Sequence, residues 1–150
     1  MTDEQIVERQ LGRPPRAFER VAVRCPFGKP AVTEQRAFDE DGNPFPTQFY
    51  VTCRYLVAAI SRLEAAGGVE RWSRAAHDDE ELARSLEAAQ AEQRRLRPEI
   101  DAGIGGSTRT GSLKCLHAHA AFALARPGYT LGDRIVAELP ALWPESCCTP

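Results

Sequence analysis

Hydrophobic and polar positions follow two different periods along the chain, and the change falls near residue 55. Between residues 18 and 53, apolar residues alternate with polar ones or gather in short β-branched and aromatic runs, which is typical of strands. The pattern predicts three strands, at 18–25, 31–38 and 47–53, separated by turns rich in Gly, Pro, Asp and Asn. We expect an antiparallel meander, in which the first and third strands run in the same direction.

From residue 55 onward the apolar residues recur at helical spacing. Leu56, Ile60 and Leu63 share one face of a predicted helix that ends at Gly67-Gly68. A short helix at 3–11, with Thr2 as its N-cap, is predicted before the strands. Further helices are expected at 69–76, from Asp78 or Asp79 to about 97, at 113–125 and at 130–139.

These elements predict a single α+β domain. A small antiparallel sheet of three strands in the N-terminal third would be covered by four to five helices. The length of 150 residues fits one domain. We expect its core at about 18–139, followed by a loose, proline-interrupted tail at 140–150.

Charge and composition narrow the class of protein. The formal net charge of −2 gives no reason to expect nucleic acid or an acidic membrane surface as a partner. No apolar run approaches the roughly 20 residues of a membrane span, and the charged N-terminus does not resemble a signal peptide. We therefore expect a cytoplasmic protein whose five cysteines are reduced.

The stretch Gly103–Ala125 carries the densest candidate chemistry, because Cys115, His117 and His119 lie within five residues. On a helix, Cys115 and His119 share a face, a spacing that suits two ligands of one metal ion, whereas His117 points about 200° away from Cys115. On a strand all three would share a face. The alanine-rich continuation favours a helix, and with it the pair Cys115 and His119. The alternative is a buried thiol and two histidines with satisfied hydrogen bonds.

Two further cysteines, Cys25 and Cys53, each end a predicted strand. Together with Cys115 and His119 they would form a Cys₃His set, which is usual for zinc. An iron–sulfur cluster held by the three cysteines is the alternative cofactor. His117 would be a substitute ligand or an acid/base group. No C-x-x-C pair supports either metal, and small buried thiols at strand ends remain the ordinary interpretation.

The loop before the predicted helix at 113–125 is rich in glycine and hydroxyl groups. Its backbone N–H groups and its arginine could bind a small anionic molecule through a phosphate or carboxylate. The candidate residues are Gly105, Gly106, Ser107, Thr108, Arg109 and Ser112. The spacing of a Walker loop is absent, so a flexible connector is the alternative.

Three motifs make the sequence resemble the bacterial domain-of-unknown-function family 501. They are RCPFGKPAV at 24–32, GNPFPTQFYVTCRYL at 42–56, and GIGG at 103–106 followed by SLKCLHAHAAFAL at 112–124. The family commonly has proline where this chain has Arg54. The resemblance implies a cytoplasmic bacterial protein without an agreed activity.

The leading hypothesis is a metal-binding protein, in which an open site would support hydrolysis of a phosphate- or carboxylate-bearing small molecule. It requires Cys25, Cys53 and Cys115 to converge near the helix that carries His119. A second hypothesis is a metal-free enzyme with Cys115 as nucleophile and His117 or His119 as base. A third is a non-enzymatic module whose helix at 79–97 docks on a partner protein. The sequence does not decide whether the protein is an enzyme.

Overall fold

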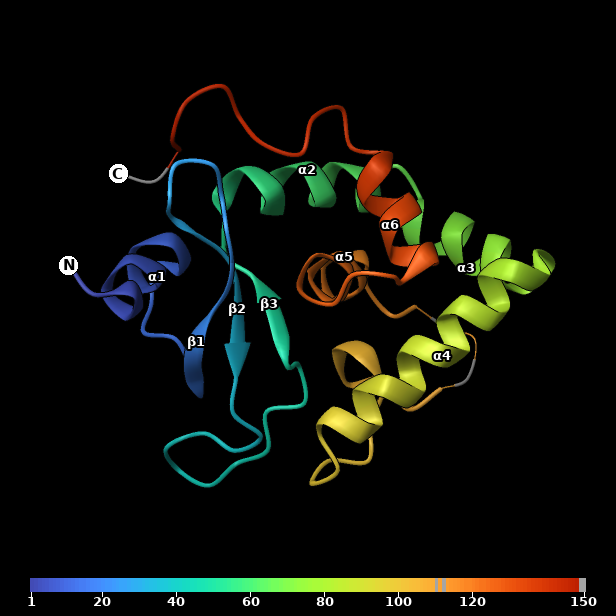
Figure 1. Cartoon of the computed structure of the whole chain (residues 1–150), viewed down its shortest axis with the longest axis horizontal. Helices are drawn as coiled ribbons and strands as arrows, with labels where there is room; N and C mark the ends of the chain where they lie inside the picture. Colours follow the sequence, from blue (N-terminus) through green and yellow to red (C-terminus); the bar gives the residue numbers. More distant parts are fainter. Residues whose placement is uncertain (110, 112, 149–150) are drawn as a thin grey trace.

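The computed structural model describes residues 1–109, 111 and 113–148, and these residues form one α+β arrangement (Figure 1). The three strands are β1 (Phe18–Arg24), β2 (Pro30–Gln35) and β3 (Phe49–Val51). A single 3₁₀ turn, η1, spans Ile104–Gly106. The helices are α1 (Asp3–Leu11), α2 (Arg54–Ala65), α3 (Gly68–Asp78), α4 (Glu80–Leu96), α5 (Leu116–Ala125) and α6 (Thr130–Ala137).

The sheet has the predicted antiparallel order β1-β2-β3, with β2 in the centre. Val32 pairs with Val23 on one side and with Val51 on the other, and β2 is almost wholly buried whereas β1 is partly exposed. The predicted second and third strands were too long, since regular pairing stops at Gln35 and spans only Phe49–Val51. Between β2 and β3 the described residues form an isolated bridge from Phe38 to Pro44, and Pro44 and Pro46 cannot donate to a sheet.

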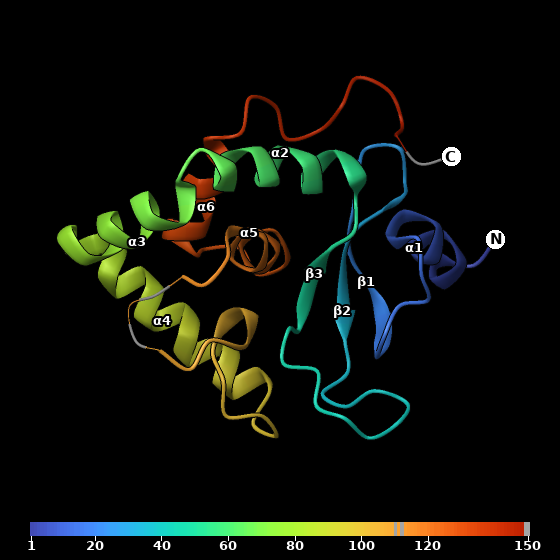
Figure 2. The same cartoon turned by 180° about the vertical axis from the view of Figure 1, so that it is seen from behind.

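Helix α5 lies at the centre of the molecule (Figures 1 and 2). It packs against β3 on one side and against α6 on the other, and seven of its ten residues are buried. Its contact with α6 is close, because a Cβ atom on Gly132 would lie 2.7 Å from that of Ala123. A helix that is apolar on all sides belongs in the core, so α5 organises the remaining elements around itself.

The helix boundaries follow local signals that the sequence displays. Thr2 forms the predicted capping box with Gln5, and Asp79 accepts a hydrogen bond from the N–H of Leu82 at the start of α4. Helix α5 starts later than predicted. Lys114 has a left-handed φ of 64° and Cys115 is extended, with φ at −151°, so neither residue is helical.

A buried polar chain joins α4 to the sheet. Gln93 donates to the side-chain oxygen of Gln48 over 3.1 Å, and Gln48 in turn donates to Glu34 on β2 over 2.9 Å. Arg97, just after α4, donates to the backbone carbonyl of Gln35. These bonds fix α4 against the strands through directional contacts, because each buried polar group needs a partner.

The segment after α6 returns along α2 (Figure 1). The hydroxyl of Tyr55 donates to the carbonyl oxygen of Ala141 over 3.0 Å, and the side chains of Leu142 and Trp143 pack against the core. The described part of this segment is therefore held more firmly than the loose tail expected from its prolines. None of the helices described in the structure is long and apolar enough to cross a membrane.

Candidate functional site

The two histidines of α5 point to different surroundings. His119 is fully buried in the core. Its Nε2 atom donates to the carbonyl oxygen of Leu113 over 2.9 Å, so Nδ1 accepts the hydroxyl proton of Tyr129 over 2.7 Å. Burial lowers the pKa of His119 to about 4 and raises that of Tyr129 well above its usual value. His119 is therefore neutral at pH 7, and both of its ring nitrogens already have partners.

His117 lies between α5 and α2. Its Nδ1 atom is 3.2 Å from a carboxylate oxygen of Glu64, and its Nε2 atom is 3.2 Å from the hydroxyl oxygen of Ser61. The other carboxylate oxygen of Glu64 accepts the N–H of Leu116 over 2.7 Å, at the first residue of α5. One glutamate thus caps α5 and orients the imidazole.

This contact pattern restricts the states of the imidazole. With its Nδ1 proton donated to Glu64, neutral His117 accepts the Ser61 hydroxyl proton at Nε2. Nε2 also lies 3.3 Å from the carbonyl oxygen of Val57, which can only accept. The protonated ring donates from both nitrogens and satisfies that oxygen as well. The contacts of both ring nitrogens thus hold the imidazole in one orientation, with Nε2 beside the Ser61 hydroxyl.

A cavity of about 590 Å³ opens beside His117 between α1, β3, α2 and α5, and we call it the His117 cavity. Its size is in the range of small-molecule sites. Arg13 and Arg54 carry charge into its lining, and no Asp or Glu of the described residues lines it. Thr52, also in the lining, is buried and its hydroxyl has no hydrogen-bond partner among the described residues.

Cys115 lines the His117 cavity together with His117, and not with His119. The predicted pairing of Cys115 and His119 on one helical face was wrong, because Cys115 precedes the helix in an extended conformation. Burial raises the pKa of the Cys115 thiol, and the negative charge of Glu64 raises it further. Cys115 is thus a protonated thiol at neutral pH.

The other two predicted ligands lie elsewhere. Cys25 follows β1 at a turn, where its N–H donates to the carbonyl oxygen of Lys29 over 2.9 Å. Cys53 is buried at the start of α2, and its sulfur lies 3.9 Å from that of Cys148. Within residues 1–109, 111 and 113–148, no three Cys, His, Asp or Glu side chains form a group able to hold a metal ion. The expected convergence of Cys25, Cys53, Cys115 and His119 is therefore not found there.

The glycine-rich loop divides between two cavities. Gly105 lines the His117 cavity, where a Cβ atom would come within 2.9 Å of Ala118 and its φ is 68°. Gly106 lies beside the side chain of Lys114. Ser107, Thr108 and Arg109 line a second cavity, and Ser112 falls outside the described residues. The five described residues of the set expected to bind one anion thus do not line a single cavity.

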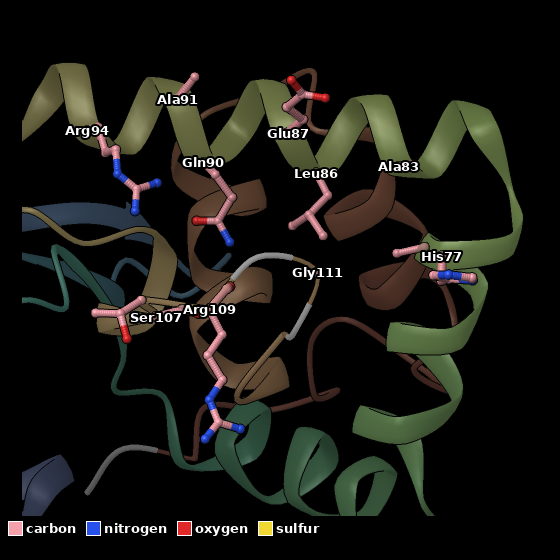
Figure 3. Close-up of a pocket in the computed structure, with 12 residues that line it drawn as sticks. His77, Ala83, Leu86, Glu87, Gln90, Ala91, Arg94, Ser107, Arg109 and Gly111 are labelled. Atoms are coloured by element: carbon pink, nitrogen blue, oxygen red, sulfur yellow. Dashed lines mark hydrogen bonds between the residues drawn. The ribbon is translucent and has the colours of Figure 1, made fainter.

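The second cavity, of about 640 Å³, lies between α3, α4 and the loop, and we call it the α4 cavity. Figure 3 shows Leu86 and Gln90 pointing from α4 toward the loop, while Arg109 extends away from α4. The Gln90 side chain accepts the N–H of Ile104 over 2.6 Å and so holds the start of the loop. Its lining combines alanine and leucine side chains with polar ones, among them His77 and Glu87. The imidazole of His77 lies 2.9 Å from a carboxylate oxygen of Asp78, but both side chains are exposed to solvent, whereas His117 and Glu64 are partly buried.

Ser61, Glu64, Thr52 and Arg13 were not predicted as site residues. Ser61 and Glu64 are three residues apart on a helix, so they share a face, but this spacing is common and carries no chemical signal alone. Only the docking of α5 on α2 brings them to His117. A Thr52 hydroxyl that lacks a partner among the described residues likewise has no sequence signature.

Comparison with known proteins adds the family. A family model described as "Protein of unknown function (DUF501)" matches residues 21–102, more than half of the chain. The matched residues include the first two motifs, around Cys25 and Cys53, and stop just before the loop that leads to His117. No curated protein and no solved structure matches the chain. The chain belongs to the DUF501 family.

Proposed function

We propose that the His117 cavity binds a small molecule bearing a carboxylate or phosphate group and hydrolyses an ester bond in it. The observation that carries the proposal is the contact series from Ser61 to His117 to Glu64 at the wall of a cavity. A nucleophile, a base and a group that orients the base are the parts of an acyl- or phosphoryl-transfer site.

The charge of the lining supports an anionic substrate. The guanidinium group of Arg54 donates to the backbone carbonyl of Gln10, and neither Arg54 nor Arg13 takes part in an ion pair among the described residues. Their positive charge is thus not neutralised by a neighbouring carboxylate. The hydroxyl of Thr52 would gain the partner that it lacks by donating to an oxygen of the ligand.

The proposed reaction follows from the two ring nitrogens. The oxygen of Ser61 forms a bond to the carbonyl carbon or phosphorus, and Nε2 of His117 takes the hydroxyl proton. The same nitrogen gives this proton to the leaving oxygen as the ester bond breaks. A water molecule then releases the acyl or phosphoryl group from Ser61 by the same proton transfers, which regenerates the hydroxyl.

A Cys115 nucleophile is the second candidate, because its thiol lines the same cavity. Its raised pKa means that His117 would have to remove the thiol proton during attack. The two candidates differ in which variant loses activity, Ser61→Ala or Cys115→Ser.

Binding is the first test, with inorganic phosphate and acetate as probes and calorimetry as the readout. We expect Arg13→Gln to weaken binding about tenfold, since a charge-assisted hydrogen bond is worth roughly 1.5–3 kcal/mol. Arg109→Gln is the matched control, because Arg109 lines the α4 cavity instead. Equal effects of the two substitutions would contradict the assignment of the anion to the His117 cavity.

Turnover is the second test, with nitrophenyl esters of dicarboxylic acids and nitrophenyl phosphate as substrates. We expect Ser61→Ala and His117→Asn each to lower kcat at least 100-fold, with KM little changed. Cys115→Ser should retain activity. Activity that survives Ser61→Ala but not Cys115→Ser would transfer the nucleophile role to the thiol. No turnover together with phosphate binding would leave a binding protein rather than an enzyme.

A further inference from the structure

Two cysteines far apart in the sequence meet at the first turn of α2. The sulfur atoms of Cys53 and Cys148 are 3.9 Å apart, and burial together with the neighbouring Cys148 thiol raises the pKa of Cys53. Cys53 is buried and Cys148 is exposed. In Figure 1 the C-terminal segment runs back along α2 to this point, near the start of the helix.

We propose that Cys53 and Cys148 are a site of reversible oxidative modification, at which a disulfide fastens the C-terminal segment to the start of α2. The proposal does not depend on the hydrolase activity. A disulfide bond is about 2.05 Å long, so the two sulfur atoms must approach by roughly 2 Å. Cys148, which is exposed, can move toward Cys53 by this amount while the core stays in place.

The packing of the segment keeps the two thiols together before oxidation. The Tyr55 hydroxyl holds the carbonyl of Ala141, and Leu142 and Trp143 pack against the core. These contacts lie seven to five residues before Cys148, so the chain between them and the thiol has little freedom. Formation of the disulfide therefore costs little further conformational entropy, because folding has already brought the two ends of the loop between Cys53 and Cys148 together.

Hydrogen peroxide is the proposed oxidant, because it can reach the exposed thiol of Cys148 from solvent. The Cys148 sulfur displaces hydroxide from peroxide and becomes a sulfenic acid, with one water formed. The sulfur of Cys53 then attacks the sulfenic sulfur, the S–S bond forms and a second water leaves. Two thiols have lost two electrons and two protons, and peroxide has gained them. A dithiol reductant reverses the reaction by thiol–disulfide exchange.

A disulfide between Cys53 and Cys148 would lie at the start of α2, next to residues of the His117 cavity. Cys53 precedes the helix directly, and its neighbours Thr52 and Arg54 both line the His117 cavity. A disulfide here would tie the wall of that cavity to the segment at 139–148. In the reduced protein the contacts that hold this segment include the Tyr55 hydrogen bond and apolar packing, and they are non-covalent.

The experiment compares wild-type protein with Cys148→Ser and with Cys147→Ser, its matched control one residue away. Each is treated with a small excess of hydrogen peroxide, alkylated, and digested for mass spectrometry under non-reducing conditions. We expect wild type and Cys147→Ser to yield a linked peptide that contains Cys53 and Cys148. Cys148→Ser should yield Cys53 as free, alkylated thiol.

Thermal unfolding gives a second measure. Oxidation should raise Tm of wild type and Cys147→Ser by roughly 5–10 °C, because the bond closes a long loop, and dithiothreitol should return it. Tm of Cys148→Ser should not respond. A link from Cys53 to Cys147, a link between two chains, or no link at all in wild type would overturn the proposal.

Discussion

Helix α5 presents two histidines, two residues apart, to opposite kinds of environment. His119 enters a dry core where a hydroxyl and a carbonyl use both of its nitrogens. His117 enters the junction with α2, where a carboxylate orients it and a cavity adjoins it. The first arrangement stabilises the neutral ring, and the second places a ring nitrogen beside a hydroxyl group at the wall of a cavity. The difference shows that histidine type and spacing do not reveal a role, whereas the partners of each ring nitrogen do.

The largest expected effect comes from removing the buried ring. His119→Ala should lower the free energy of unfolding by roughly 3–5 kcal/mol, because it leaves a core cavity and deprives Tyr129 and Leu113 of a partner. Urea denaturation followed by circular dichroism measures this. A loss below about 1 kcal/mol would mean that the core closes around the missing ring, contrary to the packing described.

The burial of His119 also predicts how the stability of the protein depends on pH. The pKa of His119 falls from 6.5 to about 4 on folding, so the unfolded chain binds a proton at a pH where the folded protein does not. This contribution to stability is complete above pH 6.5 and is lost as the pH falls toward 4, and the total loss is about 3 kcal/mol.

Unfolding curves at a series of pH values in this range provide the measurement. His119→Gln is the control, since it keeps a polar side chain but cannot titrate, and its curve should be correspondingly flatter between pH 6.5 and 4. Parallel curves for the two proteins would refute the assignment of the slope to this residue.

A smaller effect is expected from removing the Tyr129 hydroxyl group, which donates a hydrogen bond to His119. Tyr129→Phe leaves the ring in place but removes the donor to Nδ1, which should cost roughly 1–3 kcal/mol for a buried, unsatisfied acceptor. The same change should raise the pKa of His119 measured by NMR titration, because protonation no longer competes with a hydrogen bond to the neutral ring. An unchanged stability would indicate that another donor replaces the hydroxyl.

His117→Ala should have a smaller effect on stability than any of these changes, about 1 kcal/mol, because its partners are shared with solvent and with α5 itself. Its effect on turnover should be large by comparison, because the ring is the proposed base. If His117→Ala destabilised the fold as strongly as His119→Ala, the ring would be a structural element and the proposed catalytic role would lose its main support.

The smallest expected effect is that of a metal chelator. Because the described Cys25, Cys53, Cys115 and His119 do not gather, EDTA should leave Tm within about 1 °C of its starting value. Metal content by mass spectrometry of protein purified without chelator completes the test. A stoichiometric metal, or a marked fall of Tm with EDTA, would support the Cys₃His set predicted from the sequence.

Much of the fold was predictable from local signals. Gly67 and Pro98 mark helix ends, and the change of period near residue 55 separates sheet from helices. The start of α5 was not predictable, because it depends on a left-handed Lys114 rather than on a breaker residue. The candidate site was only partly predictable, since Glu64 and His117 are neighbours only after α5 has docked on α2.

The central position of α5 also bears on which parts of the chain can fold alone. The residues that match the family model, 21–102, supply all of β2, β3, α2, α3 and α4 and most of β1, but they stop before α5, against which the three strands and α2 pack. A fragment of those residues would expose the apolar surfaces that α5 covers. The amide protons of α5 should accordingly exchange with solvent only when the whole protein unfolds.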